Sequence, residues 1–294
     1  EAVTFCFLNE MEAAAFLPDG LRLVKIDEER RKDAPYLRPS IVPSLLHCRK
    51  ANQDARVRVE GGVRLFELGA VVAEEDDGKT HARKTVERRH VGIILDAGTK
   101  QEQQPAAVRT MRAAIDAIVE RLAGAGHAPV VSPSDPIFPI LKDAQSATVT
   151  IDGTLAGYLA LVTKKGASMF GLDEPCVICE LALPALIDLY PPHSRASRLP
   201  AFPEIQRDLS LVLDESVAWR DIETRLTGMD LDRCIGHEFV GTFRGKQVGA
   251  GKKSVTLRLR FRDDERTLRH EEVDPQVETV VGLMTKELGA ELRA

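Results

Sequence analysis

The sequence lacks any hydrophobic run that approaches the roughly 18 apolar residues needed for a membrane-spanning helix. It also lacks a strong excess of one charge, since 40 Lys and Arg stand against 45 Asp and Glu. The chain is therefore not basic overall, although a local cationic patch remains allowed. It begins neither with methionine nor with a charged-then-apolar signal segment, so we expect a start inside a longer protein and no membrane association.

Cysteine is scarce, with five residues scattered over 294. An odd, dispersed set predicts reduced thiols in a cytoplasmic protein. Only Cys176 and Cys179 form a Cys-x-x-Cys pair, and the surrounding apolar residues indicate a buried strand. A zinc site would need further ligands, and a thioredoxin-type motif would need the start of a helix. We therefore predict structural cysteines.

Candidate catalytic residues are equally few. The histidines His47, His81, His90 and His127 show no spacing typical of metal ligands. Residues 245–254 look superficially like a phosphate-binding loop, but two lysines precede the serine and a strand is expected to follow. We predict a β-hairpin there, and neither a catalytic residue nor a metal ligand in the chain.

The first part of the chain mixes predicted strands and helices. Apolar residues recur at helical spacing over residues 107–122, and Gly124 ends that helix. Asp152 and Gly153 suit the type I′ turn of a hairpin. The other expected elements are a helix at residues 40–51 and strands at 2–8, 63–72, 91–96, 147–151, 155–162 and 177–183. An α+β fold with an antiparallel sheet is predicted for residues 1–190.

The second part has a more regular pattern. Residues 191–199 are rich in Pro, Ser and Arg and are typical of a linker. Strands are expected at 207–214, 237–244, 254–262 and around 292, with helices at 218–226 and from Asp274-Pro275 to Gly289. Ser216 is the expected cap of the first helix. The order β-α-β-β-α-β predicts a ferredoxin-like domain over residues 200–294, with one open sheet face.

A cationic strand lies in this second domain. Between residues 239 and 262 there are seven basic residues and no acidic ones. Alternation places Leu257 and Leu259 inward and the arginines of the same strand outward. An unopposed row of guanidinium groups suits RNA phosphates and bases, whereas the alternative is a solvated strand balanced by acidic residues from elsewhere. The RNA-binding candidates are Arg244, Lys252, Lys253, Arg258, Arg260 and Arg262.

Several short motifs mark the second domain. They are Arg207-Asp208-Leu209, Phe243-Arg244-Gly245, Gly251-Lys252-Lys253-Ser254, Arg266-Thr267-Leu268 and Glu271-Glu272-Val273. In this order and spacing they resemble the ferredoxin-fold anticodon-binding domain of bacterial phenylalanyl-tRNA synthetase β subunits. The resemblance implies that the open face contacts the anticodon region of the tRNA for phenylalanine.

The first domain carries Leu37-Arg38-Pro39-Ser40 and Phe66-Glu67-Leu68-Gly69, which are similar to the synthetase-like core of the same subunit. This implies a degenerate class II synthetase-like antiparallel sheet. Catalytic class II enzymes grip ATP with an arginine shortly after the Phe-Glu-hydrophobic-Gly turn, and here that position is Ala73. The Asn-Pro expected near residues 23–26 is also missing. The resemblance therefore implies a non-catalytic core.

The same resemblance implies the partners. A catalytic α subunit would dock through the helix at residues 40–51 and adjoining apolar strands, in a heterotetramer of two α and two β subunits. The holoenzyme would use ATP and magnesium, with no cofactor in this fragment.

Two alternatives remain open at this point. An amino-acid-sensing regulatory protein with a ferredoxin-like module would need a glycine-rich turn where Asp214-Glu215-Ser216 stands. An autonomous synthetase would need an arginine in place of Ala73.

Overall fold

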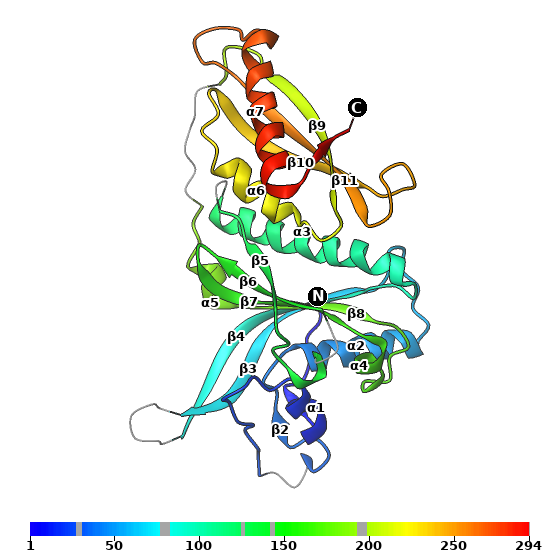
Figure 1. Ribbon diagram of the computed structural model, residues 1–294. Coiled ribbons are helices and arrows are strands. Elements are labelled where there is room, and N and C mark those ends of the chain that lie inside the picture. The colour runs from blue at the N-terminus through cyan, green and yellow to red at the C-terminus, as the bar shows by residue number, and fades with distance from the viewer. Residues whose placement is uncertain (28–30, 77–82, 125–126, 142–144, 193–198, 294) are drawn as a thin grey trace. The chain divides into compact units, whose positions relative to one another are not determined.

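The computed structural model describes residues 1–27, 31–76, 83–124, 127–141, 145–192 and 199–293. The chain forms two compact units, Glu1–Arg195 and Ala196–Ala294, each with its own antiparallel sheet and core (Figure 1). The predicted linker at residues 191–199 lies mostly outside the described residues. No helix in the described ranges is long and apolar enough to cross a membrane.

The first unit is built on a six-stranded sheet in the order β3-β4-β8-β7-β6-β5, with every neighbouring pair antiparallel. Its strands are β3 (Arg64–Asp76), β4 (Arg83–Asp96), β5 (Val130–Ser134), β6 (Ser146–Ile151), β7 (Thr154–Val162) and β8 (Cys176–Ala182). The short strands β1 (Phe7–Leu8) and β2 (Tyr36–Leu37) pair with each other. Asp152 and Gly153 have φ values of 49° and 79°, which fits the predicted type I′ hairpin.

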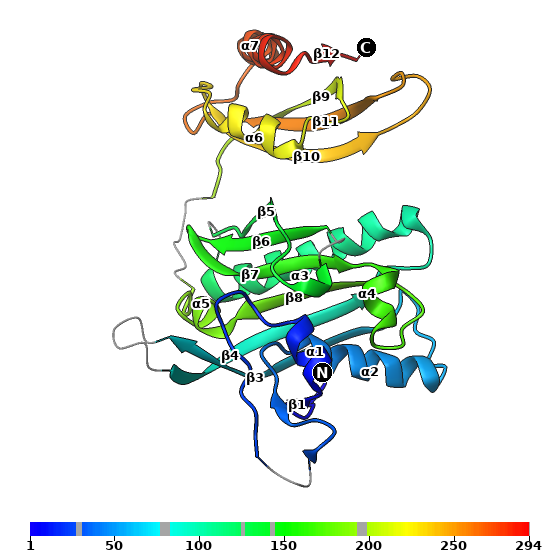
Figure 2. The same ribbon diagram turned by 60° about the horizontal axis from the view of Figure 1, so that its bottom comes forward.

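Helices cover both faces of this sheet (Figures 1 and 2). One face carries α1 (Glu10–Ala15), α2 (Val42–Asp54) and α4 (Lys164–Ser168), and the other carries α3 (Gln104–Ala123) and α5 (Leu183–Ile187). Successive strand residues point to opposite sides, so each face has its own core. In β8, for example, Ile178 packs on the α2 side and Val177 on the α3 side.

The same alternation separates the two cysteines of the Cys-x-x-Cys pair. Residues three apart on a strand face opposite sides, and Cys176 and Cys179 indeed lie in different cores. Burial raises the pKa of Cys176 to about 12 and also raises the pKa of Cys179. The predicted buried strand is confirmed, and the two thiols cannot hold one metal ion between them.

The second unit has the predicted β-α-β-β-α-β order. It consists of β9 (Ile205–Asp214), α6 (Trp219–Thr227), β10 (Cys234–Phe243), β11 (Lys252–Phe261), α7 (His270–Leu288) and β12 (Glu291–Leu292). The sheet order is β10-β11-β9-β12, all antiparallel, and α6 and α7 pack on one face through residues such as Ile222 and Val280. The α+β fold class is confirmed.

Several expected element boundaries in the first unit are wrong; the strand expected at residues 91–96, for example, is β4 (Arg83–Asp96) and begins eight residues earlier. Only Phe7 and Leu8 of the strand expected at residues 2–8 form a strand, because Ala2 instead donates a single backbone hydrogen bond to Phe66. The strand expected at residues 63–72 is observed as β3, and it contains the Phe66–Gly69 motif, where alternation buries Glu67.

Both helix starts of the second unit also differ from prediction. Ser216 does not cap α6, since it donates to Asp214, and the carboxylate of Asp221 accepts from the N–H of Ala218. Helix α7 starts at His270 rather than at Asp274-Pro275 because Glu272 accepts from the backbone N–H of Arg269.

Gly157 gives a test of the sheet packing. A Cβ at this position would lie 2.0 Å from the Glu180 carbonyl oxygen, which is backbone and cannot move aside. We expect Gly157→Ala to lower the free energy of unfolding by about 3 kcal/mol. Gly282→Ala is the control, since open space surrounds Gly282 in α7 and a gain of about 0.5–1 kcal/mol is expected. Chemical denaturation measures both, and equal stability of the two variants would contradict the packing.

Candidate nucleic-acid interface

The open face of the second unit is the side of its sheet opposite α6 and α7. In β11, Leu257 and Leu259 enter the core, so Arg258 and Arg260 project from the open face. The strands on either side place Asp208 of β9 and Glu238 of β10 directly opposite Arg258. The sheet therefore brings together charges that are far apart in sequence.

Arg258 pairs with both of these carboxylates. Its Nε and Nη2 donate to the two carboxylate oxygens of Asp208 at 2.6 and 2.8 Å, and its Nη1 lies 3.5 Å from Glu238. The hydrogen bond from Arg258 lowers the pKa of Asp208, and the same bond raises the pKa of Arg258. The expected unopposed row of guanidinium groups is thus wrong here, because neighbouring strands supply the acidic residues.

Arg260 is different. No hydrogen bond or ion pair to its side chain occurs within the described residues, and its Nε is buried without a partner. The guanidinium group lies over Gly236, where an added Cβ would come within 3.2 Å of Nη2. A buried donor without an acceptor is costly. Among the described residues, Arg260 is therefore the open-face arginine that has no competing carboxylate.

The cations near the hairpin are tied to acidic or carbonyl groups. Arg244 forms a forked pair with Glu215, and this bond lowers the pKa of Glu215. Lys252 contacts Glu291 at 2.8 Å. Lys253 is buried, and its Nζ donates to the Glu215 carbonyl oxygen. Lys253 thus holds the turn after β9 and is poorly exposed for RNA.

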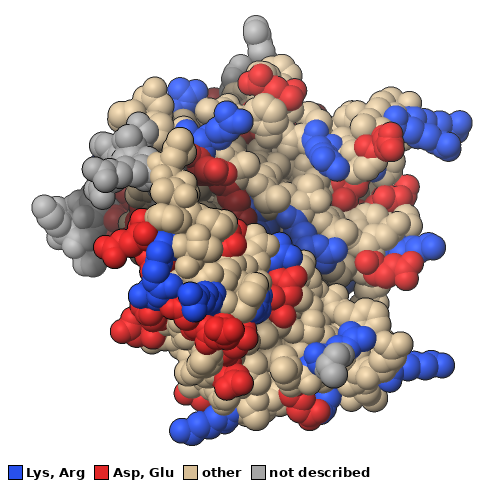
Figure 3. All heavy atoms as spheres, turned by 90° about the horizontal axis from the view of Figure 1, so that it is seen from above, with Lys and Arg blue, Asp and Glu red and all other residues tan. Residues whose placement is uncertain are grey.

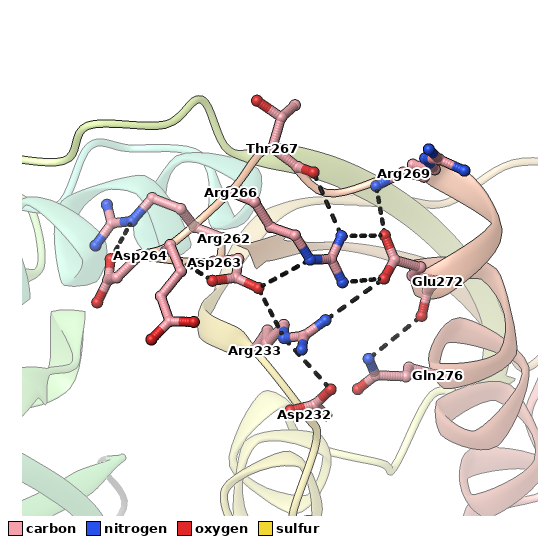
Figure 4. A network of polar contacts seen from close by, with 11 residues as sticks. Asp232, Arg233, Arg262, Asp263, Asp264, Arg266, Thr267, Arg269, Glu272 and Gln276 are labelled. Atoms are coloured by element: carbon pink, nitrogen blue, oxygen red, sulfur yellow. Dashed lines mark hydrogen bonds and ion pairs between the residues drawn. The ribbon is translucent and has the colours of Figure 1, made fainter.

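Arg262 lies beside a network of charged residues that joins the end of β11 to α7. Its Nε is 3.3 Å from the exposed Asp264 (Figure 4). Within the network, Arg233 contacts Asp263 at 3.1 Å. Of the six predicted RNA-binding residues, the structure therefore brings Arg258, Arg260 and Arg262 onto one strand side but leaves only Arg260 without an acidic partner in the described ranges.

Glu272 is the centre of this network. Figure 4 shows the fork of Arg266 facing both of its oxygens, and Arg266 Nη1 donates at 2.9 Å. Glu272 also accepts the N–H of Arg269 and lies 3.5 Å from Arg233. The bonds from Arg266, reinforced by Arg269, lower the pKa of Glu272 to about 2. The carboxylate thereby fixes both the loop and the start of α7.

One open-face residue escaped the sequence reasoning. Phe243, at the end of β10, is an exposed aromatic residue opposite Ser254, and the guanidinium group of Arg293 lies 5.0 Å from its ring centroid. Phe243 stood in a motif that was read only for its arginine. The signal available was an aromatic residue at an outward position, which is a common platform for stacking an RNA base.

On the face drawn in Figure 3, Lys and Arg side chains alternate with Asp and Glu, and no broad region of one sign is visible. That face therefore presents no large cationic field for nonspecific attraction of a polyanion.

In the first unit, the position where an ATP-binding arginine would be expected is occupied by a buried alanine. Ala73 is buried in β3. Nearby, the buried Glu67 pairs with Arg38 at 2.9 Å and accepts a hydrogen bond from Thr4. Among the described residues, no group of three or more His, Cys, Asp or Glu is arranged to hold a metal ion.

A second buried carboxylate, Glu180 of β8, joins four segments. It accepts from the Ser40 hydroxyl at 2.5 Å, the Ile41 N–H at 3.2 Å and the Tyr158 hydroxyl at 3.0 Å, and His90 Nδ1 lies 2.7 Å away. Burial raises the pKa of Tyr158 well above its ordinary value, and the charge of Glu180 adds to this. The carboxylate anchors the start of α2 to the sheet.

Comparison with protein families identifies both units. Residues 1–183 match the family described as the phenylalanyl tRNA synthetase beta chain CLM domain, and residues 200–293 match the ferredoxin-fold anticodon binding domain. The two matches define a synthetase-associated protein with an anticodon-binding domain. The chain belongs to the phenylalanyl-tRNA synthetase β-chain family.

The similarity to individual proteins agrees with this family assignment. The chain is 25% identical to the phenylalanine–tRNA ligase β subunit of Dehalococcoides mccartyi over 295 residues, covering all of this chain and 35% of that protein. It is 27% identical to the β subunit of Syntrophotalea carbinolica over 278 residues, covering 92% of this chain and 33% of that protein. The chain thus spans about a third of the length of these relatives. The reported matches give the amino-acid-sensing alternative no support.

Among solved structures, the pyrrolysyl-tRNA synthetase of Desulfitobacterium hafniense aligns with 63% of this chain and 61% of its own, with a TM-score of 0.45 and 16% identity. A likeness of this size supports no conclusion about the chain.

The Glu272 network predicts an acid-sensitive fold of the second unit. The pKa of Glu272 is about 2 in the folded chain, against an ordinary value of 4.5. The ionised carboxylate therefore contributes its full stabilisation of the folded state when the pH is above the ordinary pKa. That contribution is lost as the pH falls toward 2. We expect Glu272→Gln to lower stability at pH 7 and to flatten the loss of stability between pH about 5 and 2.

The matched control is Glu271→Gln, which removes the same charge from the neighbouring residue. Glu271 makes no polar side-chain contact within the described residues. Denaturant unfolding followed at several pH values measures the effect. If the free energy of unfolding depended on pH in the same way for the wild type and Glu272→Gln, the network would not be a source of acid sensitivity.

Proposed function

We propose that the chain is the C-terminal region of the β subunit of a cytoplasmic phenylalanine–tRNA ligase. The observation that carries this proposal is the occurrence of both family matches, in order, along one chain. Residues 1–190 would be a non-catalytic core that docks the catalytic α subunit, residues 191–199 a linker, and residues 200–294 the domain that binds the anticodon region of the tRNA for phenylalanine.

The tRNA surface we propose is the open face of the second unit. Arg260 contributes a guanidinium group without an acidic partner in the described ranges, and Phe243 contributes an exposed ring. Arg258 and Arg262 can join by exchanging carboxylate for phosphate, since a guanidinium fork fits either group. Lys252 and Arg244 lie at the hairpin end and would extend the contact along the RNA. Lys253 would act by holding the turn.

The docking surface we propose is the outer edge of β3. Ala2 donates to the Phe66 carbonyl oxygen at 2.8 Å, so the first residues run alongside this strand. Val3 and Phe5 are 91% and 81% exposed there, and Leu68 of β3 is half exposed. Exposed apolar side chains grouped in one place are typical of a protein interface. Val3 and Phe5 lie close to Ser44 and His47 of α2, the helix expected to dock, whereas Leu68 points to the other face of the sheet.

The chemistry would then belong to the partner. ATP, magnesium and phenylalanine would bind the α subunit in a heterotetramer of two α and two β subunits. The burial of Ala73 and the pairing of Arg38 with Glu67 support this division, because the first position carries no guanidinium group and the Arg38 guanidinium group is already paired with a carboxylate.

For tRNA binding, we expect Arg260→Gln to weaken affinity about tenfold at low salt and to reduce the salt slope by about 0.7–0.9, as loss of one phosphate contact requires. Phe243→Ala should cost about 1–3 kcal/mol of binding free energy with the slope unchanged, because stacking releases no counterions. Fluorescence anisotropy at several salt concentrations separates the two effects.

The control for these variants is Lys286→Gln in α7, on the helical side of the same unit, which should leave affinity and slope unchanged. If Arg260→Gln bound tRNA with wild-type affinity at low salt while the chain still co-purified with an α subunit, the open face would be excluded as the RNA surface but the family role would stand.

For subunit docking, we expect Phe5→Asp to abolish co-purification with a co-expressed α subunit, because a carboxylate would be buried in an apolar interface. The matched control is Ile187→Asp in α5, a similarly exposed apolar residue away from the β3 edge. Circular dichroism checks that both variants remain folded. Retention of the α subunit by Phe5→Asp would contradict the assignment of this edge.

A further inference from the structure

A recess of about 240 Å³ opens on the α2-bearing side of the first unit's sheet. Its walls are mostly apolar and include Ile137, Phe138 and Leu155. The rings of Phe138 and Tyr158 pack edge to face with centroids 4.9 Å apart. Glu180 and His90 line the same recess. A small apolar space beside a few convergent polar groups has the features of a ligand site.

The charge of Glu180 is not balanced by a fixed cation. None of the described residues that line the recess is Lys or Arg. The contacts of Glu180 come from hydroxyl groups, a backbone N–H and His90, all neutral unless the imidazole is protonated. Glu67, by contrast, has Arg38 as its counter-charge. A buried anion with only neutral donors favours a nearby cation.

His90 can contribute an acceptor for such a cation. Its Nδ1 lies 2.7 Å from a carboxylate oxygen that can only accept, so the proton of the neutral ring is on Nδ1. The other ring nitrogen, Nε2, then carries a lone pair. An ammonium group could donate to this nitrogen while the adjacent carboxylate stabilises its charge. The aromatic walls also favour a cation with an apolar substituent.

We propose that this recess binds small primary ammonium compounds that carry one apolar group. The ammonium lies at Glu180 and His90, and the apolar group lies against Phe138 and Tyr158. Free amino acids are disfavoured, because none of the described residues that line the recess is a Lys or Arg that could pair with their carboxylate. The test measures binding of small molecules to the chain alone, so its success or failure leaves the proposed tRNA and α-subunit contacts untouched.

The test uses the 294-residue chain and three probes: benzylamine, the neutral isostere benzyl alcohol, and the zwitterion phenylalanine. Isothermal titration calorimetry should show benzylamine binding about tenfold more tightly than benzyl alcohol, as expected for one partly buried charge interaction, and phenylalanine binding more weakly than benzylamine. Equal affinity for amine and alcohol, or no binding of benzylamine at millimolar concentration, would overturn the proposal.

A substitution at the mouth of the recess locates the binding. Leu155 is 62% exposed, so changing it should leave the core intact. Leu155→Lys should weaken benzylamine binding about fivefold relative to Leu155→Gln, because the added cation repels the ammonium, and should leave benzyl alcohol binding equal in the two variants. Thermal unfolding confirms that both variants are folded. Identical benzylamine affinities in the two variants would place binding elsewhere and refute the assignment.

Discussion

The buried carboxylate of Glu180 is the contact on which the arrangement of the first unit depends. It is almost fully buried, and a carboxylate in that environment is tolerated only when donors meet its oxygens. Those donors come from Ser40 and Ile41 before α2, from Tyr158 in β7 and from His90 in β4. The requirement fixes where α2 begins against the sheet, although 140 residues separate Ser40 from Glu180.

In the second unit, by contrast, the charged residues lie on an outward face of the sheet and pair with one another. Strand alternation buries one side of β11 and drives its arginines outward, where acidic residues from β9 and β10 meet them. An exposed pair such as Arg258 with Asp208 adds little to stability. It does hold the guanidinium fork in one orientation, so less side-chain entropy is lost when a phosphate replaces the carboxylate. The cost is a competing anion, so we expect Arg260, which has no acidic partner among the described residues, to attract an RNA phosphate more strongly than Arg258 does.

Strands and helices that bury one face can be predicted from the sequence. Contacts that depend on which residues of neighbouring elements lie opposite one another cannot. The β-α-β-β-α-β order followed from alternation and helical periodicity, and the type I′ hairpin from Asp152-Gly153. The helix starts were wrong because several residues could cap, and the structure uses Asp221, which accepts from Ala218, at α6 and Glu272, which accepts from Arg269, at α7. The cations of the candidate interface were visible, but their partners were not. Asp208 lies 50 residues from Arg258, and a register shift in β10 between Phe239 and Gly241 separates the part that faces Arg258 from the part that presents Phe243.

The recess and the residues before α2 both contact the carboxylate of Glu180. Strand periodicity puts Glu180 on the α2-bearing side of β8, where two of its four contacts hold the residues before α2 and a third involves His90, which also lines the recess. A cation bound beside Glu180 would draw on the same oxygens that accept from Ser40 and Ile41. Its binding free energy would therefore include any change in how firmly α2 is anchored. A partner that fixes α2 would change the affinity of the recess for the cation by the same factor by which the cation changes the affinity for that partner. Because the donors to Glu180 are neutral, a cation can bind there and alter the anchoring of α2. The Arg38–Glu67 pair already contains a counter-charge and allows no such coupling.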